Sequence, residues 1–567
     1  MTAVVEGELM SADLVIRGGT VVDGTGTPGR QADVAVTDGV ISEIGDGLQA
    51  DRELDASGQI VSPGFIDIHS HYDAQVFWDP ALTPSSFHGV TSVVAGNCGF
   101  SIAPCRPEHR ALLARTLQHV EDMNLATLEA GIPWDFETFP QYLDSVTRHG
   151  VGLNYGVYVG HTAVRLFVMG EEGYEREHAT ADELAAMQAV VREAMEAGAM
   201  GFATSSSATH NGDEGRPVPS RLADLAELES LLAPLHDLDK GVAALLPGER
   251  IKHADVYALQ RRIGRPLTWT ALLTIKGFPW HEGIIEDNDK ARAEGGQVWP
   301  QVSVRPLVFQ MNLREPFTFN MAPAFAELMA EPDAVRLERY ADPAWRERAI
   351  GDLNNKAFLR PNWDALEVAE STAHPELIDR KVVDIAKERG CTPIDVMLDL
   401  SLDENLETRF RSTLANNDPE AIAWLLGREG VLLGLADSGA HVSQLCDACL
   451  PTDLLGNWVR EREVLSLERA INKLTGEPAG VFGLDAIDGG RGLLREGMAA
   501  DITVFDLDTV APGPLRRIHD FPADGERLTA DAPSGMTHTL VNGVPIRLDG
   551  TPVTGESDPR PGTVLRS

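Results

Sequence analysis

The middle of the chain alternates apolar, strand-like runs with amphipathic helices, and this pattern constrains the fold more than any other feature of the sequence. The strand-like runs lie at 90–96, 154–160, 198–204, 242–246, 267–273 and 431–437. Helical stretches such as Ala181 to Glu196 and Leu222 to Leu232 lie between them. Continuous apolar strands that alternate with helices are typical of a parallel sheet covered by helices. So many strands of this kind favour a closed barrel over an open sheet.

Both ends of the chain follow a different, period-two pattern. Short alternating runs broken by Gly and Asp-Gly extend from Ala12 to Ser62, and similar runs return at Ala500 and, with an Asn-Gly turn signal, at Thr539. These patterns indicate antiparallel strands and tight turns. We therefore expect residues 1–62 and 491–567 to form one small β-domain around a barrel at 63–490. Two separate terminal domains are the alternative.

The regular alternation lapses between residues 288 and 375, where proline, arginine and aromatic residues are frequent. A long irregular stretch inside a compact domain is often a functional lid or an insertion. We interpret 288–375 as an insertion that covers the mouth of the barrel.

Charge and cysteine content exclude several classes of function. The 567 residues include 86 acidic and 48 basic ones, for a formal net charge of −38. That charge repels phosphate backbones and anionic lipids, so binding to nucleic acid or to a membrane surface is not expected. Five cysteines suit reduced thiols rather than a disulfide framework. With no secretion signal and no run near the ~20 apolar residues of a membrane helix, we expect a cytoplasmic protein.

Two histidines directly follow the first barrel strand, in Gly64-Phe-Ile-Asp-Ile-His-Ser-His. Because alternate residues of an extended chain point to the same side, His69 and His71 can both reach one metal ion. Barrel enzymes build their sites at the C-terminal ends of the strands, which is where this pair is expected. The sequence therefore predicts a metal site here.

Asp437 and Cys98 are predicted at the ends of two further strands. A carboxylate at the end of an apolar strand is costly to bury unless it meets a cation or takes part in catalysis. The alternative for Asp437 is a helix N-cap. Cys98 lies between Asn97 and Gly99, and it is either a metal thiolate or a small buried hydrophobic residue.

These residues together resemble the amidohydrolase superfamily, and within it the N-acyl-D-amino-acid deacylase (D-aminoacylase) family. The segments that carry the resemblance begin at Gly64, Val94, Val159, Gly198 and Gly492. The resemblance implies an α/β fold: a TIM-like (β/α)8 barrel, a β-sandwich domain assembled from both chain termini and a small inserted domain. It also implies an amidohydrolase that acts on a non-peptide C–N bond of a small molecule, most simply an N-acyl-amino acid.

By the same resemblance, His69, His71 and Cys98 match metal ligands, and Asp437 matches an aspartate that binds metal and transfers protons. The family also places two metal histidines on later strands. The corresponding stretches here, 242–248 and 269–274, contain none, and His253 and His281 lie away from those strand ends. The sequence therefore supports one Zn²⁺ ion and gives no support for a second.

Several weaker candidates could contact the substrate. His161 follows a strand and His441 lies four residues after Asp437, while Arg250, Lys276 and Arg305 are cations that could bind the substrate carboxylate. Each has a purely structural role as its alternative. Cys446 and Cys449 form one CxxC pair without a second pair, so two buried thiols are expected rather than a zinc ribbon.

Three other functions stay open at this point. The first is hydrolysis of a cyclic amide or another peptide-like small molecule. The second is a metal-free serine amidase that uses Ser205 to Ser207. The third is a non-catalytic ligand-binding barrel, which the two missing histidines favour and the His69, His71 and Asp437 set opposes. A homo-oligomer is compatible with all of these readings.

Overall fold

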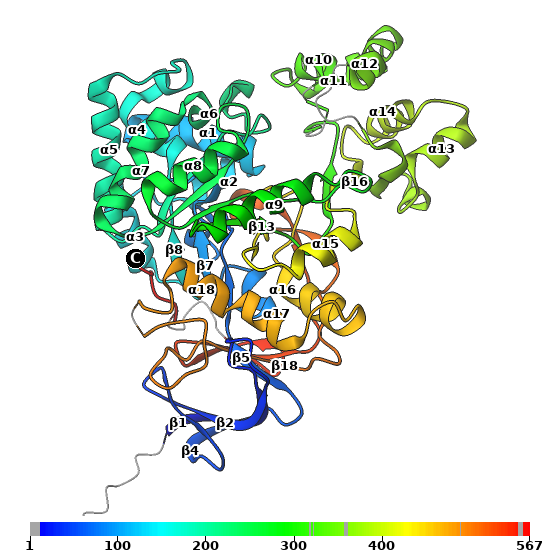
Figure 1. Cartoon of the computed structure of the whole chain (residues 1–567). Helices are drawn as coiled ribbons and strands as arrows, with labels where there is room; N and C mark the ends of the chain where they lie inside the picture. Colours follow the sequence, from blue (N-terminus) through cyan, green and yellow to red (C-terminus); the bar gives the residue numbers. More distant parts are fainter. Residues whose placement is uncertain (1–11, 317–318, 321, 356–360, 488, 554–559) are drawn as a thin grey trace, which may run out of the picture.

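The computed structural model describes residues 12–316, 319–320, 322–355, 361–487, 489–553 and 560–567. Figure 1 shows three regions: a β-rich end that includes the first described strands, a central body of strands and helices, and a helical extension around α10 to α14. Among the described residues, no helix combines the length and the apolar character needed to cross a membrane.

The central body is built on parallel strands. One sheet has the order β6-β7-β8, and a second has the order β17-β13-β12-β11-β10-β9. Only Tyr158 separates β8 from β9, and a parallel bridge between Ser70 and Ser438 joins the segments that follow β6 and β17. From β6, neighbouring parallel strands can therefore be followed through β7, β8 and β9 to β17. The bridge between Ser70 and Ser438 then leads from β17 back to β6. The bounds are β6 Phe65–Asp67, β7 Val90–Ala95, β8 Asn154–Val157, β9 Val159–Gly160, β10 Gly201–Ser205, β11 Val242–Leu246, β12 Leu267–Trp269, β13 Val298–Val302 and β17 Leu432–Leu433.

Amphipathic helices flank these strands. Helix α5 (Ala181–Glu196) has the predicted bounds, and its start is fixed by a capping box between Thr180 and Glu183. Helix α7 (Leu225–Leu238) begins later than predicted because Asp224 caps it. The other helices of the body are α1 Arg110–Glu121, α2 Leu125–Gly131, α3 Phe139–His149, α4 His161–Met169, α6 Pro219–Leu222, α8 His253–Ile263, α9 Trp280–Ala293, α15 Pro419–Leu426, α16 Leu450–Asp453, α17 Leu467–Leu474 and α18 Gly476–Phe482.

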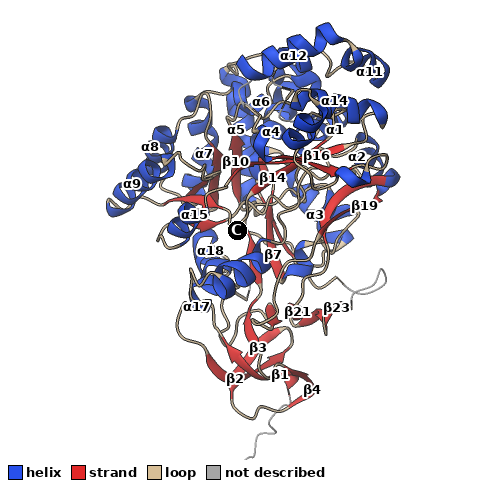
Figure 2. Ribbon diagram, turned by 90° about the vertical axis from the view of Figure 1, so that its right-hand side faces the viewer, coloured by secondary structure: helices blue, strands red, loops and turns tan. Residues whose placement is uncertain are grey.

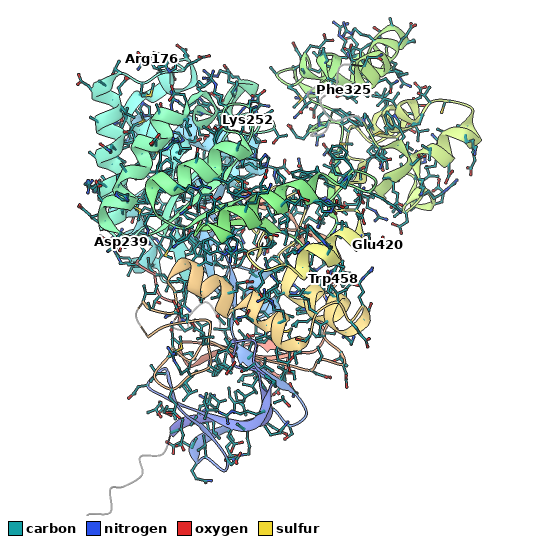
Figure 3. The ribbon with its side chains drawn as sticks, viewed as in Figure 1. Arg176, Asp239, Lys252, Phe325, Glu420 and Trp458 are labelled. Atoms are coloured by element: carbon teal, nitrogen blue, oxygen red, sulfur yellow. The ribbon has the colours of Figure 1, made fainter. Side chains whose placement is uncertain are left out.

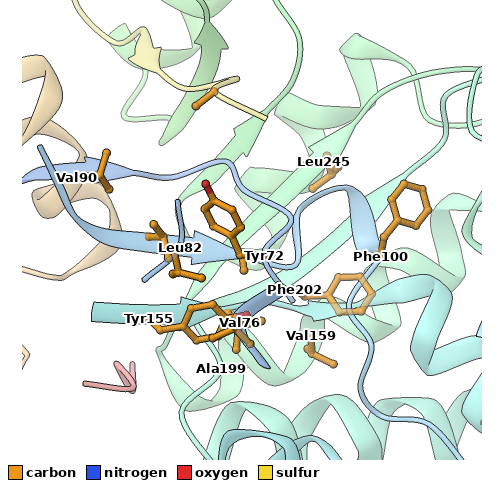
Figure 4. Close-up of a cluster of buried hydrophobic side chains, with 14 of the residues drawn as sticks. Tyr72, Val76, Leu82, Val90, Phe100, Tyr155, Val159, Ala199, Phe202 and Leu245 are labelled. Atoms are coloured by element: carbon orange, nitrogen blue, oxygen red, sulfur yellow. The ribbon is translucent and has the colours of Figure 1, made fainter. Parts of the chain in front are cut away.

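The largest hydrophobic core lies between the strands and their helices. Figure 4 shows part of it, with Tyr155, Phe202 and Leu245 contributed by β8, β10 and β11. Trp458, which Figure 3 labels, belongs to the same core. Burial of these side chains fixes the strand positions from which the functional residues extend.

The two ends of the chain form one nine-stranded sheet, in agreement with the alternating pattern of the sequence. Strand β5 pairs in parallel with β1 from the N-terminal segment and antiparallel with β18 from the C-terminal segment. The order is β23-β22-β21-β18-β5-β1-β2-β3, with β4 paired to β1. The bounds are β1 Ala12–Val21, β2 Arg30–Thr37, β3 Val40–Gly45, β4 Ala50–Asp55, β5 Ile60–Pro63, β18 Ile502–Phe505, β21 Met536–Val541, β22 Val544–Leu548 and β23 Thr551–Pro552. A separate hairpin joins β19 (Leu515–Phe521) to β20 (Gly525–Ala530).

The helical extension has a hydrophobic core of its own, which contains Phe325 and spans Met311 to Phe410. Figure 2 shows α11 and α12 at the end of the molecule opposite the terminal sheet. The antiparallel sheet of the helical extension has the order β14-β16-β15. The bounds are β14 Leu307–Met311, α10 Pro323–Ala326, α11 Asp333–Ala341, α12 Pro343–Asn355, β15 Leu366–Glu370, α13 Val382–Arg389, α14 Pro393–Asp403 and β16 Arg409–Ala415.

This unit differs in extent from the irregular stretch predicted at 288–375. Helix α9 and strand β13 still belong to the parallel body, and the core of the extension continues to Phe410. Strand β13 is hidden in the sequence because Pro300 and Gln301 interrupt its apolar run, although both are buried. The extension therefore begins later and ends later than the composition suggests.

Candidate metal centre

The loops after β6 and β17 bring His69, His71 and Asp437 together. The Nε2 atoms of His69 and His71 each lie 3.2 Å from Oδ1 of Asp437, and the two ring centroids are 5.5 Å apart. The contact follows from the Ser70–Ser438 bridge, which aligns the two strand ends. The side chain of Asp437 is 22% exposed, so water can reach it, whereas both histidines are buried.

Cys98 completes the cluster from the loop after β7. Gly96 (φ 81°) and Cys98 (φ 55°) both have left-handed backbone conformations, which turn the chain sharply after the strand. The Sγ atom of Cys98 lies 3.9 Å from Nε2 of His69, and the donor atoms of Cys98, His69 and His71 are all within 4.8 Å of one another. Of the two readings of Cys98, this geometry favours the metal thiolate.

A chain of hydrogen bonds fixes the tautomer of His69. Thr268 donates to the carbonyl of Trp299 at 2.9 Å, so its hydroxyl oxygen accepts from Nε2 of Gln301 at 3.0 Å. The amide oxygen of Gln301 then faces Nδ1 of His69 at 2.8 Å and accepts its proton. When His69 is neutral, as a metal ligand must be, its lone pair is therefore on Nε2, the atom that faces Cys98 and Asp437.

Glu121 has the corresponding role for His71. Its Oε1 lies 3.0 Å from Nδ1 of His71, and both side chains are buried. The carboxylate orients the imidazole so that Nε2 faces Asp437. Glu121 is the last residue of α1, where a negative charge interacts unfavourably with the helix dipole. This unfavourable position is the local feature of the sequence that could have indicated a functional role for Glu121.

The charges of the cluster fit a divalent cation. Burial lowers the pKa of His69, but Asp437 and Cys98 outweigh this effect and raise the pKa to about 10. Burial raises the pKa of both Asp437 and Cys98, yet the neighbouring histidines bring each pKa below its usual value. Two partly buried acids are thus stabilised as anions beside two protonated imidazoles. A donor set of two nitrogens, one sulfur and one carboxylate oxygen is one that Zn²⁺ accepts.

His161 lies outside this cluster. Its Nδ1 is 2.7 Å from the hydroxyl of Thr204, and its Nε2 is 3.0 Å from Oε1 of Glu227. Both ring nitrogens are therefore used inside the protein. The geometry corresponds to the structural alternative rather than to a contact with metal or substrate.

The three cations proposed as carboxylate anchors are also placed elsewhere. Arg250 pairs with Glu177 at 2.7 Å, and the side chain of Lys276 is exposed. Arg305 pairs with Asp447 at 2.7 Å and Asp453 at 3.3 Å, and these carboxylates contribute to raising its pKa. Since two carboxylates already neutralise Arg305, it is not positioned as a free anchor for a substrate anion.

His441 lies near the cluster, together with His210, which the sequence did not indicate. The ring of His441 packs on Phe309 of β14 with centroids 5.1 Å apart, and the ring of His210 packs on Phe100 at 4.9 Å. Burial lowers the pKa of both, to about 3 for His210, where the charges of His441 and His71 act in the same direction. His210 follows β10, so its place at a strand end could have indicated it.

The histidines near the later strands do not join the metal ligands. The ring of His253 meets Trp269 edge-on at 4.7 Å, and His281 packs against Trp424 at 5.7 Å. In the part of the chain that the structure describes, the group of possible metal ligands whose donor atoms all lie within 4.8 Å of one another consists of His69, His71 and Cys98.

The serine cluster after β10 stabilises a loop. Ser205 accepts a hydrogen bond from the amide of Ser207, and Ser206 accepts from the amides of Arg250 and Ile251. These contacts are those of a structural turn, and they weaken the serine amidase alternative. Cys446 and Cys449 are both buried, as expected.

Two deacylases are similar to this chain over nearly its whole length. The N-acyl-D-glutamate deacylase of Alcaligenes xylosoxydans xylosoxydans is 29% identical, with 98% of this chain and 96% of that protein covered. The D-aminoacylase of the same organism is 29% identical over 94% of each chain.

Two solved structures are similar over 98% of this chain and 100% of their own. One is the N-acyl-D-glutamate deacylase of Bordetella bronchiseptica with zinc and a phosphonate inhibitor that mimics the tetrahedral intermediate (27% identity, TM-score 0.67). The other is a D-aminoacylase described as having a binuclear metal centre, with activation by one metal and attenuation by a second (25% identity, TM-score 0.68). The model of the amidohydrolase family matches residues 52–547, so this chain is a member of the amidohydrolase family.

Proposed function

We propose that this protein is a metal-dependent deacylase that hydrolyses the amide bond of an N-acyl-amino acid. The observation that carries the proposal is the convergence of two imidazole Nε2 atoms and a thiol beside the carboxylate of Asp437. The deacylases among its relatives, one of them solved with zinc, support the same substrate class.

His69, His71, Cys98 and Asp437 would hold one Zn²⁺ ion. When bound, such an ion polarises a carbonyl group and makes water more acidic. Both contacts of Asp437 with the histidines use Oδ1, so Oδ2 can take a proton from the attacking water. Asp437 would then pass this proton to the amide nitrogen as the C–N bond breaks, which gives a carboxylic acid and an amine.

The parallel strands fit the TIM-like (β/α)8 barrel that the family resemblance implies. In this proposal β8 and β9 count as one strand, and the Ser70–Ser438 bridge closes the ring. The nine-stranded terminal sheet corresponds to the β-sandwich domain, and residues 307–415 form the inserted domain. The site then lies at the C-terminal ends of the strands, where barrel enzymes bind their substrates.

Cyclic amides and other peptide-like small molecules are a second candidate substrate class. The absence of histidine at the ends of β11 and β12 favours this candidate, because the centre differs there from the pattern implied for deacylases. A panel of N-acyl-D-amino acids, N-acyl-L-amino acids and cyclic amides separates the two classes.

The test is turnover of this panel by the zinc-loaded protein and by Asp437→Asn. We expect the wild type to release the free amino acid and the variant to lose at least about 100-fold in kcat while remaining folded. The control is Asp289→Asn, a change at an exposed aspartate of α9. Wild-type activity in the D437N variant would contradict the role of Asp437, and turnover of cyclic amides alone would contradict the substrate class.

A further inference from the structure

Several buried polar atoms outside the metal centre have no hydrogen-bond partner among the described residues. They belong to the short helical turn Ser85–His88 and to strands β21 and β22. Ser86 Oγ, His88 Nε2, Thr539 Oγ1 and all three guanidinium nitrogens of Arg547 have no partner among the described residues. Arg547 is only 1% exposed, so solvent does not compensate for the missing contacts.

The register of the terminal sheet places Thr539 and Arg547 on one face. Thr503 of β18 pairs with Thr539 of β21, which pairs with Arg547 of β22, so the three side chains form a row across the sheet. The hydroxyl of Thr503 donates to the carbonyl of Gly89 at 3.0 Å, which shows that this face meets the 85–89 turn. The guanidinium carbon of Arg547 lies 5.5 Å from the ring centroid of Phe87 in that turn.

The charge of Arg547 has no counter-ion among the described residues. A guanidinium group stays protonated in proteins, and an unpaired buried charge is strongly unfavourable. Arg527 of β20 is similarly buried but forms an ion pair with Asp520 at 2.7 Å. The contrast indicates that a group other than the described residues compensates the positive charge of Arg547.

His88 adds a place for a water molecule. Thr452 donates to the carbonyl of Cys449 at 3.0 Å, so its oxygen accepts the Nδ1 proton of His88 at 2.8 Å. The Nε2 atom is therefore an acceptor, and burial together with the charges of Arg305 and Arg547 lowers the pKa of His88 to about 3. A water can donate one hydrogen to Nε2 and the other to an anion beside Arg547.

We propose that Arg547 and Thr539, together with Ser86 and His88 of the facing turn, form a binding site for a small monovalent anion such as chloride. The guanidinium group supplies the compensating charge, and the two hydroxyls supply further donors. Complete burial restricts the site to a small ion, and the single uncompensated charge matches a monovalent one. The ion would connect the 85–89 turn, which leads into β7 and Cys98, to the sheet built from both chain ends.

The first experiment is thermal unfolding of the full-length protein dialysed into sodium gluconate and then titrated with sodium chloride at constant ionic strength. We expect a saturable rise in the unfolding temperature, because chloride at about 100 times its Kd raises the folded-to-unfolded ratio about 100-fold. The variant Arg547→Met should lose this response. Arg30→Met, a change at an exposed arginine of β2 in the same sheet, should keep it. A wild-type protein without the response, or an R547M variant that keeps it, would overturn the proposal.

A second measurement avoids the risk that R547M does not fold. Crystals of the wild-type protein prepared in bromide are examined by anomalous diffraction. We expect a bromide peak within hydrogen-bond distance of the Arg547 guanidinium. Density at that position without an anomalous signal means water only, and it would overturn the proposal whatever the outcome of the deacylase assay.

Discussion

Glu121 offers a test of how the protein prepares the metal centre. Glu121→Gln keeps the size of the side chain and a possible acceptor for Nδ1 of His71, but it removes the buried negative charge 3.0 Å from that nitrogen. Changes at groups that orient a metal-bound histidine typically cost 10–100-fold in metal affinity. At about 1.4 kcal/mol for each factor of ten, this loss corresponds to about 1.4–2.8 kcal/mol of zinc-binding free energy.

The assay is competition for Zn²⁺ against a chromophoric chelator, with circular dichroism to confirm that the variant is folded. The matched control is Glu108→Gln, a change at an exposed glutamate in the turn that precedes α1. A folded E121Q variant that binds zinc as tightly as the wild type would refute the reasoning that Glu121 orients His71.

Two further predictions concern protons and stability. Because the pKa of ion-free His69 is raised to about 10, zinc must displace a proton below that pH, so we expect affinity to rise with pH by about tenfold per unit for each proton released. A zinc affinity that does not change with pH below about 10 would disagree with the charges described here. His161→Ala should cost about 2–3 kcal/mol of unfolding free energy in urea, because Glu227 loses a buried partner, and it should leave zinc affinity unchanged. Loss of zinc binding in the folded variant would contradict this structural role and would indicate that His161 belongs to the metal centre.

Local patterns in the sequence were enough to place three of the candidate metal ligands. His69 and His71 share one strand end, and Asp437 ends an apolar run, so each could be placed by alternation and by the parallel topology alone. Glu121 and Gln301 could not be found in this way. Their contacts with the histidines depend on how α1 and β13 pack in three dimensions, at 50 residues or more along the chain from their partners.

Other differences arose where long-range contacts override composition. His161 looks available at a strand end, yet Glu227 and Thr204 take both of its nitrogens. Arg305 looks like an anion anchor until the fold brings Asp447 and Asp453 to it. Strand β13 was hidden because a proline and a glutamine interrupt its apolar run, and the inserted unit was therefore placed too early.

The most direct test of the central claim is zinc K-edge X-ray absorption on the protein loaded with zinc and checked for metal content. We expect one zinc per chain, with a single sulfur ligand at about 2.3 Å and nitrogen or oxygen ligands at about 2.0–2.2 Å. The sulfur contribution should disappear in Cys98→Ser. A zinc shell without sulfur, or one that C98S leaves unchanged, would contradict the convergence of His69, His71, Cys98 and Asp437 on one ion.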